Sequence, residues 1–146
     1  MKRATVLVTG AGGPAGINVV KLLKRDGFRV VAADASPYSE GFALADASYV
    51  IHPAHEPRFA EELEGIAAKE GADLVIVTVD EEIEALSGRE LGEKYVMHPP
   101  STVTVCLNKY LTYETLAGLI PEIVPQYSTR PQDLGSEQIV AKPVRG

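Results

Sequence analysis

The sequence predicts an α/β fold in which helices cover both faces of a doubly wound parallel sheet. Three short runs, 4–8, 29–33 and 73–77, are almost entirely apolar, as strands buried on both faces of a parallel sheet must be. Segments with the apolar spacing of helices separate these runs, and such alternation is typical of parallel sheets. We expect the strand at 4–8 to be central, with the other two strands on either side of it.

The elements between these strands follow from local patterns. In the first helix, 14–27, apolar residues recur from Ile17 to Leu23, basic residues lie opposite them, and Gly27 is a natural end. Three acids open the helix at 80–91, where they suit the positive end of its dipole. The remaining predicted elements are helices over 56–71 and 101–108 and short strands over 48–51 and 95–97.

Composition limits the class of protein. The 146 residues, 45% hydrophobic and 23% charged, suit an ordinary globular domain with a real core. A net charge of −6 argues against a nucleic-acid partner, and no apolar stretch is long enough to span a membrane. The single cysteine, Cys106, excludes an internal disulfide framework and fits a reducing, cytoplasmic compartment. We expect it to be a buried structural thiol.

A glycine-rich loop joins the first strand to the first helix. Gly10, Gly13 and Gly16 follow a G-x-x-G-x-x-G spacing, and Gly12 adds a fourth glycine. Because glycine has no Cβ, either a ligand or the helix itself can approach such a loop closely. The amides at the start of the helix could also bind an anion. The loop alone therefore leaves ligand binding and tight helix–strand packing as alternatives.

Acidic residues follow the second and third apolar strands. Asp34 lies 18 residues after Gly16, where an acid commonly accepts hydrogen bonds from a ribose. Asp80 and Glu81 follow the third strand. Carboxyl ends of parallel strands share the edge at which ligands bind, so we expect these acids beside the glycine loop. Asp34 could instead cap a loop. Asp80, Glu81 and Glu82 could contact substrate, or they could simply stabilise the helix that they begin.

Parts of the sequence are compatible with two other kinds of site. The loop and Asp34 resemble those of extended short-chain dehydrogenases and sugar-nucleotide epimerases, so an NAD(P)- or nucleotide-sugar-binding domain of an oxidoreductase or epimerase is the alternative. Those enzymes need a Tyr-x-x-x-Lys pair for proton transfer, and none of the six tyrosines has a lysine four residues later. His52 and His55 could hold a metal, but no third ligand is evident nearby in the sequence.

The second half of the chain resembles an ATP-grasp ligase of the carbamoyl-phosphate-synthase-like branch. The stretch GADLVIVTVDEEIEAL looks like the family's strand that ends in Asp-Glu-Glu and runs into a helix. NKYLTYETL is similar to the stretch where an Asp-Lys pair precedes a helix, with Asn108 in place of the aspartate. IVPQYS resembles the proline-containing strand that follows, and IVAKPVRG resembles the strand and Lys-Pro that open the glycine-rich ATP-binding loop.

This resemblance implies a Rossmann-like pre-ATP-grasp domain over 1–127, which does not bind NAD, followed by a linker and the first strand of an ATP-binding domain over 128–146. It implies that Lys109 and Lys142 contact ATP phosphates, which need cations at their oxygens. The residues expected to face the substrate are Gly10, Gly12, Gly13, Gly16, Asp34, Asp80 and Glu81.

The implied reaction is ATP-dependent. A carboxylate is phosphorylated and an amine then attacks the acyl phosphate, with magnesium held by acids in a later part of the ATP-grasp domain. Because the chain stops at Gly146, where the phosphate loop would begin, we expect a fragment that is inactive alone and binds neither ATP nor magnesium tightly. Its expected partners are the small carboxylate and amine substrates and the remaining ATP-grasp domain. A homo-oligomer stays open.

Overall fold

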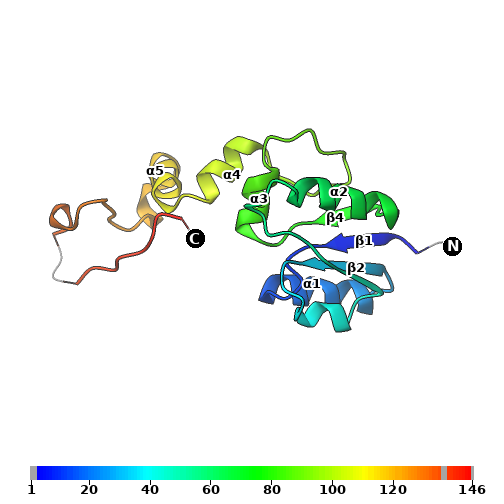
Figure 1. Cartoon of the computed structure of the whole chain (residues 1–146). Helices are drawn as coiled ribbons and strands as arrows, with labels where there is room; N and C mark the ends of the chain where they lie inside the picture. The colour runs from blue at the N-terminus through cyan, green and yellow to red at the C-terminus, as the bar shows by residue number, and fades with distance from the viewer. Residues whose placement is uncertain (1–2, 136–137, 146) are drawn as a thin grey trace. The chain divides into compact units, whose positions relative to one another are not determined.

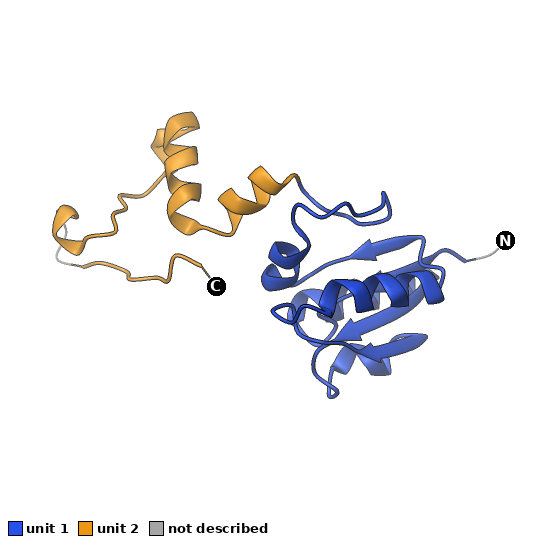
Figure 2. Cartoon of the chain, turned by 45° about the horizontal axis from the view of Figure 1, so that its top comes forward, with its two compact units in different colours: residues 1–98 blue, residues 99–146 orange. Residues whose placement is uncertain are grey.

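The computed structural model describes residues 3–135 and 138–145. They form two compact units that divide between His98 and Pro99 (Figure 2). The predicted domain boundary after Tyr127 lies elsewhere in the chain, and it stays a prediction because a division into compact units does not test it. No helix in the described ranges is both long and apolar enough to cross a membrane.

The first unit contains a four-stranded parallel sheet (Figure 1). Its strands run in the order β3-β2-β1-β4, and Val6 of the central strand pairs with Val30 on one side and Leu74 on the other. This arrangement confirms the predicted α/β fold and the central place of the first strand. The strands are β1 (Thr5–Val8), β2 (Arg29–Asp34), β3 (Ala47–Val50) and β4 (Leu74–Ile76).

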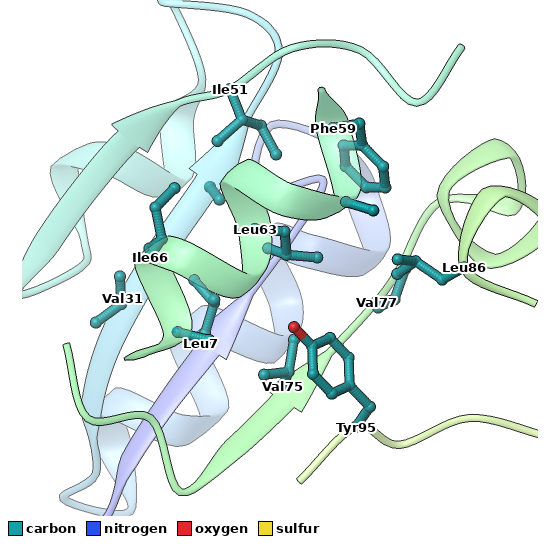
Figure 3. Close-up of a cluster of buried hydrophobic side chains, with 13 residues drawn as sticks. Leu7, Val31, Ile51, Phe59, Leu63, Ile66, Val75, Val77, Leu86 and Tyr95 are labelled. Atoms are coloured by element: carbon teal, nitrogen blue, oxygen red, sulfur yellow. The ribbon is translucent and has the colours of Figure 1, made fainter. Parts of the chain in front are cut away.

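Helices α1 (Pro14–Arg25) and α2 (Phe59–Lys69) cover opposite faces of the sheet (Figure 1). On the α2 face, Leu7 and Val31 belong to a buried cluster with Leu63 (Figure 3). On the α1 face, the neighbouring strand residues Val6, Val8 and Val30 form a second cluster with Val20. Successive residues of one strand therefore enter different cores, which explains why the strands are apolar throughout.

Two predicted elements are shorter than expected. Helix α3 (Asp80–Leu86) ends before the predicted residue 91, because Ser87 is extended and Gly88 has a φ of +80°. A glycine at positive φ is a common helix end. The predicted strand at 95–97 is reduced to a single parallel bridge between Tyr95 and Val75.

The second unit consists of α4 (Pro100–Cys106), α5 (Lys109–Leu119) and two 3-10 turns, Pro121–Ile123 and Pro131–Asp133. Asn108 caps α5, since its side-chain oxygen accepts the N–H groups of Tyr110 and Leu111 at 3.1 Å each. The expectation of a buried thiol is wrong. Cys106 is exposed, because the short helix α4 buries Val103 and leaves Cys106 uncovered.

The two strands that the resemblance implies in this unit are not seen. In the described residues, 123–128 and 138–143 contain no strand. A strand needs a neighbouring strand to pair with its N–H and C=O groups, and the described part of the second unit offers none.

Candidate functional site

The carboxyl edge of the sheet brings together the glycine loop, the end of β2 and the segment that leads into α3. The Ala11 N–H donates to the Ala33 carbonyl at 3.3 Å. From the β4 side, the Thr78 hydroxyl donates to the Thr9 carbonyl at 2.8 Å. The sequence predicted this grouping from the topology, and in open α/β sheets this edge is where ligands bind.

Two glycines of the loop are required by packing. Gly10 has a φ of +58°, and a Cβ there would lie 2.3 Å from the Val79 side chain. A Cβ on Gly16 would lie 2.1 Å from the Gly10 carbonyl oxygen. Distances this short exclude any side chain at either position. Packing of the loop against α1 and against the segment before α3 therefore accounts for these two glycines without a ligand.

Asp34 lies at the end of β2 and its carboxylate accepts two backbone groups. Oδ2 accepts the Gly12 N–H at 2.7 Å, and Oδ1 accepts the Ser36 N–H at 2.8 Å. Within the chain, Asp34 therefore caps the loop, which is one of the two roles considered for it from the sequence. Each carboxylate oxygen has a second acceptor position, so a role in substrate contact stays a prediction.

Glu82 is a buried carboxyl group at this edge. Its side chain accepts the hydroxyl of the fully buried Thr9 at 2.5 Å. Burial raises the pKa of Glu82 to about 7, the negative charges of Asp34 and Glu81 add to the rise, and the Thr9 hydrogen bond opposes it. A buried carboxyl group with a strongly raised pKa in such a position is a candidate functional group.

The three acids that begin α3 differ in burial. Asp80 and Glu81 are exposed, whereas Glu82 is 6% exposed. The sequence contains a signal for the burial of Glu82. This residue lies four positions before the buried Leu86 and so on the same helix face. Substrate contact by Asp80 and Glu81 stays a prediction.

Within the second unit, the backbone segments that carry the two predicted ATP-binding lysines lie next to each other. Lys109 is the first residue of α5, and its N–H donates to the Val144 carbonyl at 2.9 Å. Lys142, two residues before Val144, is exposed. The segment around Lys142 therefore lies beside the start of α5, although the two lysines are far apart in the sequence.

Among the residues that the structure describes, no group of three or more His, Cys, Asp or Glu side chains could hold a metal ion. His52 instead contacts α2. Its Nδ1 lies 2.9 Å from the Glu62 carboxylate, which also accepts the His52 backbone N–H at 2.8 Å. These contacts lower the pKa of Glu62, so this pair anchors the loop that precedes α2.

Solved structures resemble this chain at low sequence identity. N5-carboxyaminoimidazole ribonucleotide synthetase from Thermotoga maritima is 24% identical over 79% of this chain and 30% of that protein, with a TM-score of 0.58. The Staphylococcus aureus N5-carboxyaminoimidazole synthetase complexed with ADP is 21% identical over 81% of this chain and 31% of that protein (TM-score 0.60). The biotin carboxylase domain of Hydrogenobacter thermophilus 2-oxoglutarate carboxylase, in complex with MgADP, is 16% identical over 81% and 28% (TM-score 0.58).

At these identities the likeness shows a shared fold, and the chain spans about a third of the length of those proteins. No significant match was found among curated protein sequences. A family profile described as the PylC-like N-terminal domain matches residues 6–95, more than half of the chain. The resemblance to the ATP-grasp superfamily is confirmed by this match and by the shared fold. This chain belongs to the PylC-like N-terminal domain family, whose fold is that of a pre-ATP-grasp domain.

Proposed function

We propose that this chain is the N-terminal, substrate-facing domain of an ATP-dependent ligase that joins a small carboxylate to a small amine. We further propose that it is inactive without the rest of that enzyme. The family match supports the first statement. The limited coverage of the similar structures, some of which were solved with ADP or MgADP, supports the second.

The family match over residues 6–95 carries this proposal, and the acidity around Glu82 supports the choice of substrate for this edge. The charges that raise its pKa, those of Asp34 and Glu81, are both negative. A substrate ammonium group at this edge would favour the ionised carboxylate, because an opposite charge nearby offsets the cost of burial. The acidic edge of the sheet thus suits the amine substrate. We add Glu82 to the proposed substrate contacts, which otherwise remain those predicted from the sequence.

The second unit would supply cations to ATP. Lys109 and the segment that carries Lys142 lie side by side, as two groups that contact one polyphosphate must. Losing one charge-assisted phosphate contact weakens binding by about 1.5–3 kcal/mol. Magnesium, when bound, would neutralise phosphate charge in the reaction, and we propose that its ligands belong to the remaining ATP-grasp domain.

The test is ADP formation by the complete protein with ATP and magnesium, over a matrix of small carboxylates and amines. We expect ADP release that requires one carboxylate and one amine together. Lys142→Ala should raise the ATP KM roughly tenfold or more, with Lys109→Ala having a smaller effect and Lys69→Ala, on α2, serving as the control. Wild-type values in both Lys142→Ala and Lys109→Ala would contradict the assignment of these lysines.

A further inference from the structure

The carboxylate of Asp34 joins two loops that follow different strands. Gly12, which donates to Oδ2, belongs to the loop after β1, and Ser36, which donates to Oδ1, belongs to the connection after β2. The two hydrogen bonds are short and go to a charged acceptor, which makes them stronger than bonds between neutral groups. One side chain therefore links the glycine loop to the β2–β3 connection.

The same two loops are in close steric contact. A Cβ at Gly41, in the 3-10 turn Glu40–Ala43, would lie 2.4 Å from the Ala11 carbonyl oxygen. A Cβ at Gly12 would lie 3.2 Å from both the Asp34 carboxylate and the Ser39 hydroxyl. The buried Ser39 hydroxyl has no hydrogen-bond partner within the described ranges. The hydrogen bond that joins the two loops at Gly12 is therefore the one to Asp34.

The amide groups of the glycine loop are used inside the chain. Ala11 donates to the Ala33 carbonyl at 3.3 Å and Gly13 to the Gly10 carbonyl at 3.0 Å. Both of these acceptors are backbone groups, whereas the amide between them, Gly12, donates to a side chain. Removing the Asp34 carboxylate would therefore release the middle amide of the loop without deleting a backbone acceptor.

We propose that Asp34 is a positioning residue that holds the glycine loop against the β2–β3 connection, so that the backbone at this edge is in place before a substrate binds. Such preorganisation lowers the ordering cost of binding. The inference goes beyond the proposed function, because it does not depend on which carboxylate or amine is bound. It also gives Asp34 a different role from the ribose contact that an acid at this position has in dinucleotide-binding domains.

The first test is amide hydrogen exchange by NMR on the 146-residue chain and its Asp34→Ala variant. We expect exchange at Gly12 and Ser36 to accelerate roughly ten- to hundredfold, which is the loss of a hydrogen bond to a charged group. The amide of Val31 in the core should keep its rate, and Asp26→Asn, a change at an exposed aspartate, should leave all these rates unchanged. Wild-type exchange at both amides in a folded Asp34→Ala variant would overturn the proposal.

The second test distinguishes a positioning carboxylate from a side chain that only fills space, and it does not require the alanine variant to fold. Asp34→Asn keeps the size of the side chain but replaces one of the two acceptor oxygens with an NH2 group, which cannot accept a hydrogen bond. Exchange should therefore accelerate at whichever of the Gly12 and Ser36 amides loses its acceptor, while Val31 keeps its rate. Wild-type exchange at both amides in Asp34→Asn would overturn the proposal.

Discussion

Two carboxyl groups at opposite edges of the sheet, Glu70 and Glu82, have opposite surroundings. At the amino edge, Glu70 accepts hydrogen bonds from the Tyr49 hydroxyl and the Arg29 guanidinium, and its pKa is lowered. Asp46 at the same edge accepts from Lys24 at 2.6 Å and from the Val30 N–H at 2.7 Å. At the carboxyl edge, the buried Glu82 has a raised pKa because of burial and negatively charged neighbours.

The difference separates structural acids from a functional candidate. A carboxylate with cationic and N–H partners stabilises the folded chain and requires nothing further. A buried carboxyl group among other acids reduces the stability of the fold at neutral pH. Stability therefore does not explain why it is there, whereas binding of a cationic group would. Glu70 lies at the end of α2 and Glu82 lies in the first turn of α3. Their surroundings rather than their sequence neighbours distinguish them.

The largest expected effect is at the carboxyl edge, in the variant Glu82→Gln. The pKa of Glu82 is about 7 in the folded chain and ordinarily 4.5, so the folded state binds its proton more tightly than the unfolded state. Its contribution to stability is fully present below pH 4.5 and is lost as the pH rises through about 7. The loss is at most about 3 kcal/mol.

Chemical denaturation between pH 4.5 and 8 of wild type and Glu82→Gln measures this effect. The glutamine variant should gain relative stability as the pH rises, while Glu81→Gln, a change at an exposed neighbour on the same helix, should show a much smaller change. If the difference in the free energy of unfolding between wild type and Glu82→Gln stays constant with pH, the contrast between Glu82 and Glu70 is wrong.

At the amino edge we expect the opposite pH dependence. The lowered pKa of Glu70 means that its stabilisation is present above the ordinary value of 4.5 and is lost as the pH falls through the folded value. Glu70→Gln should therefore lower the free energy of unfolding by about 1–2 kcal/mol at pH 7 and by less in acid. Denaturant titration at pH 7 and pH 3 measures it, with the exposed Glu61→Gln on α2 as control. Equal losses at both pH values would argue against the ion pair.

A smaller effect is expected at two tyrosines. The Tyr95 hydroxyl is buried in the apolar cluster (Figure 3) and has no hydrogen-bond partner among the described residues. Tyr95→Phe should leave stability unchanged or raise it by up to about 1 kcal/mol, because the hydroxyl is desolvated without compensation. Tyr49→Phe, which removes the bond to Glu70, should lower it by about 1 kcal/mol. Thermal unfolding compares them, and destabilisation by Tyr95→Phe would indicate an unseen partner.

The smallest expected effect concerns dinucleotides at the carboxyl edge. Calorimetric titration of the chain with NAD and with NADP should give no binding in the micromolar range. The physical reasons are that the loop amides from Ala11 to Gly13 donate within the chain and that the sequence lacks the Tyr-x-x-x-Lys pair. Micromolar binding of either dinucleotide would favour the oxidoreductase alternative and would make this edge a nucleotide site.

The parts of the fold that could be predicted depend on patterns that extend over several residues. The strands around Leu7 and Val31 are apolar on both faces, which only a covered parallel sheet explains. The early end of α3 depends on the local backbone angles of Ser87 and Gly88. The burial of Glu82 depends on how α3 is rotated against the sheet, and tertiary packing determines that rotation. The run of three acids at 80–82 does not indicate which of them is buried.

The site was predictable in its location and less so in its contacts. Topology alone places Asp34 and the glycine loop at one edge. That Asp34 bonds Gly12 depends on the path of the β2–β3 connection, where Gly41 packs on Ala11. Sequence spacing carries no information about such a path. In the second unit, the contact between Lys109 and Val144 is likewise a tertiary contact, and no local sequence pattern predicts it.

The pairing of β1 with β4 has a consequence for how the chain is made. The hydrogen bond from the Thr5 amide to Asp73 joins residues 68 positions apart, and the one from Thr9 to Glu82 joins residues 73 apart. During synthesis, one edge of the central strand stays unpaired until more than half of the chain has left the ribosome. An open strand edge of this kind invites association with other chains. We therefore expect chains interrupted before residue 74 to aggregate, and chains that extend past Glu82 to close the sheet.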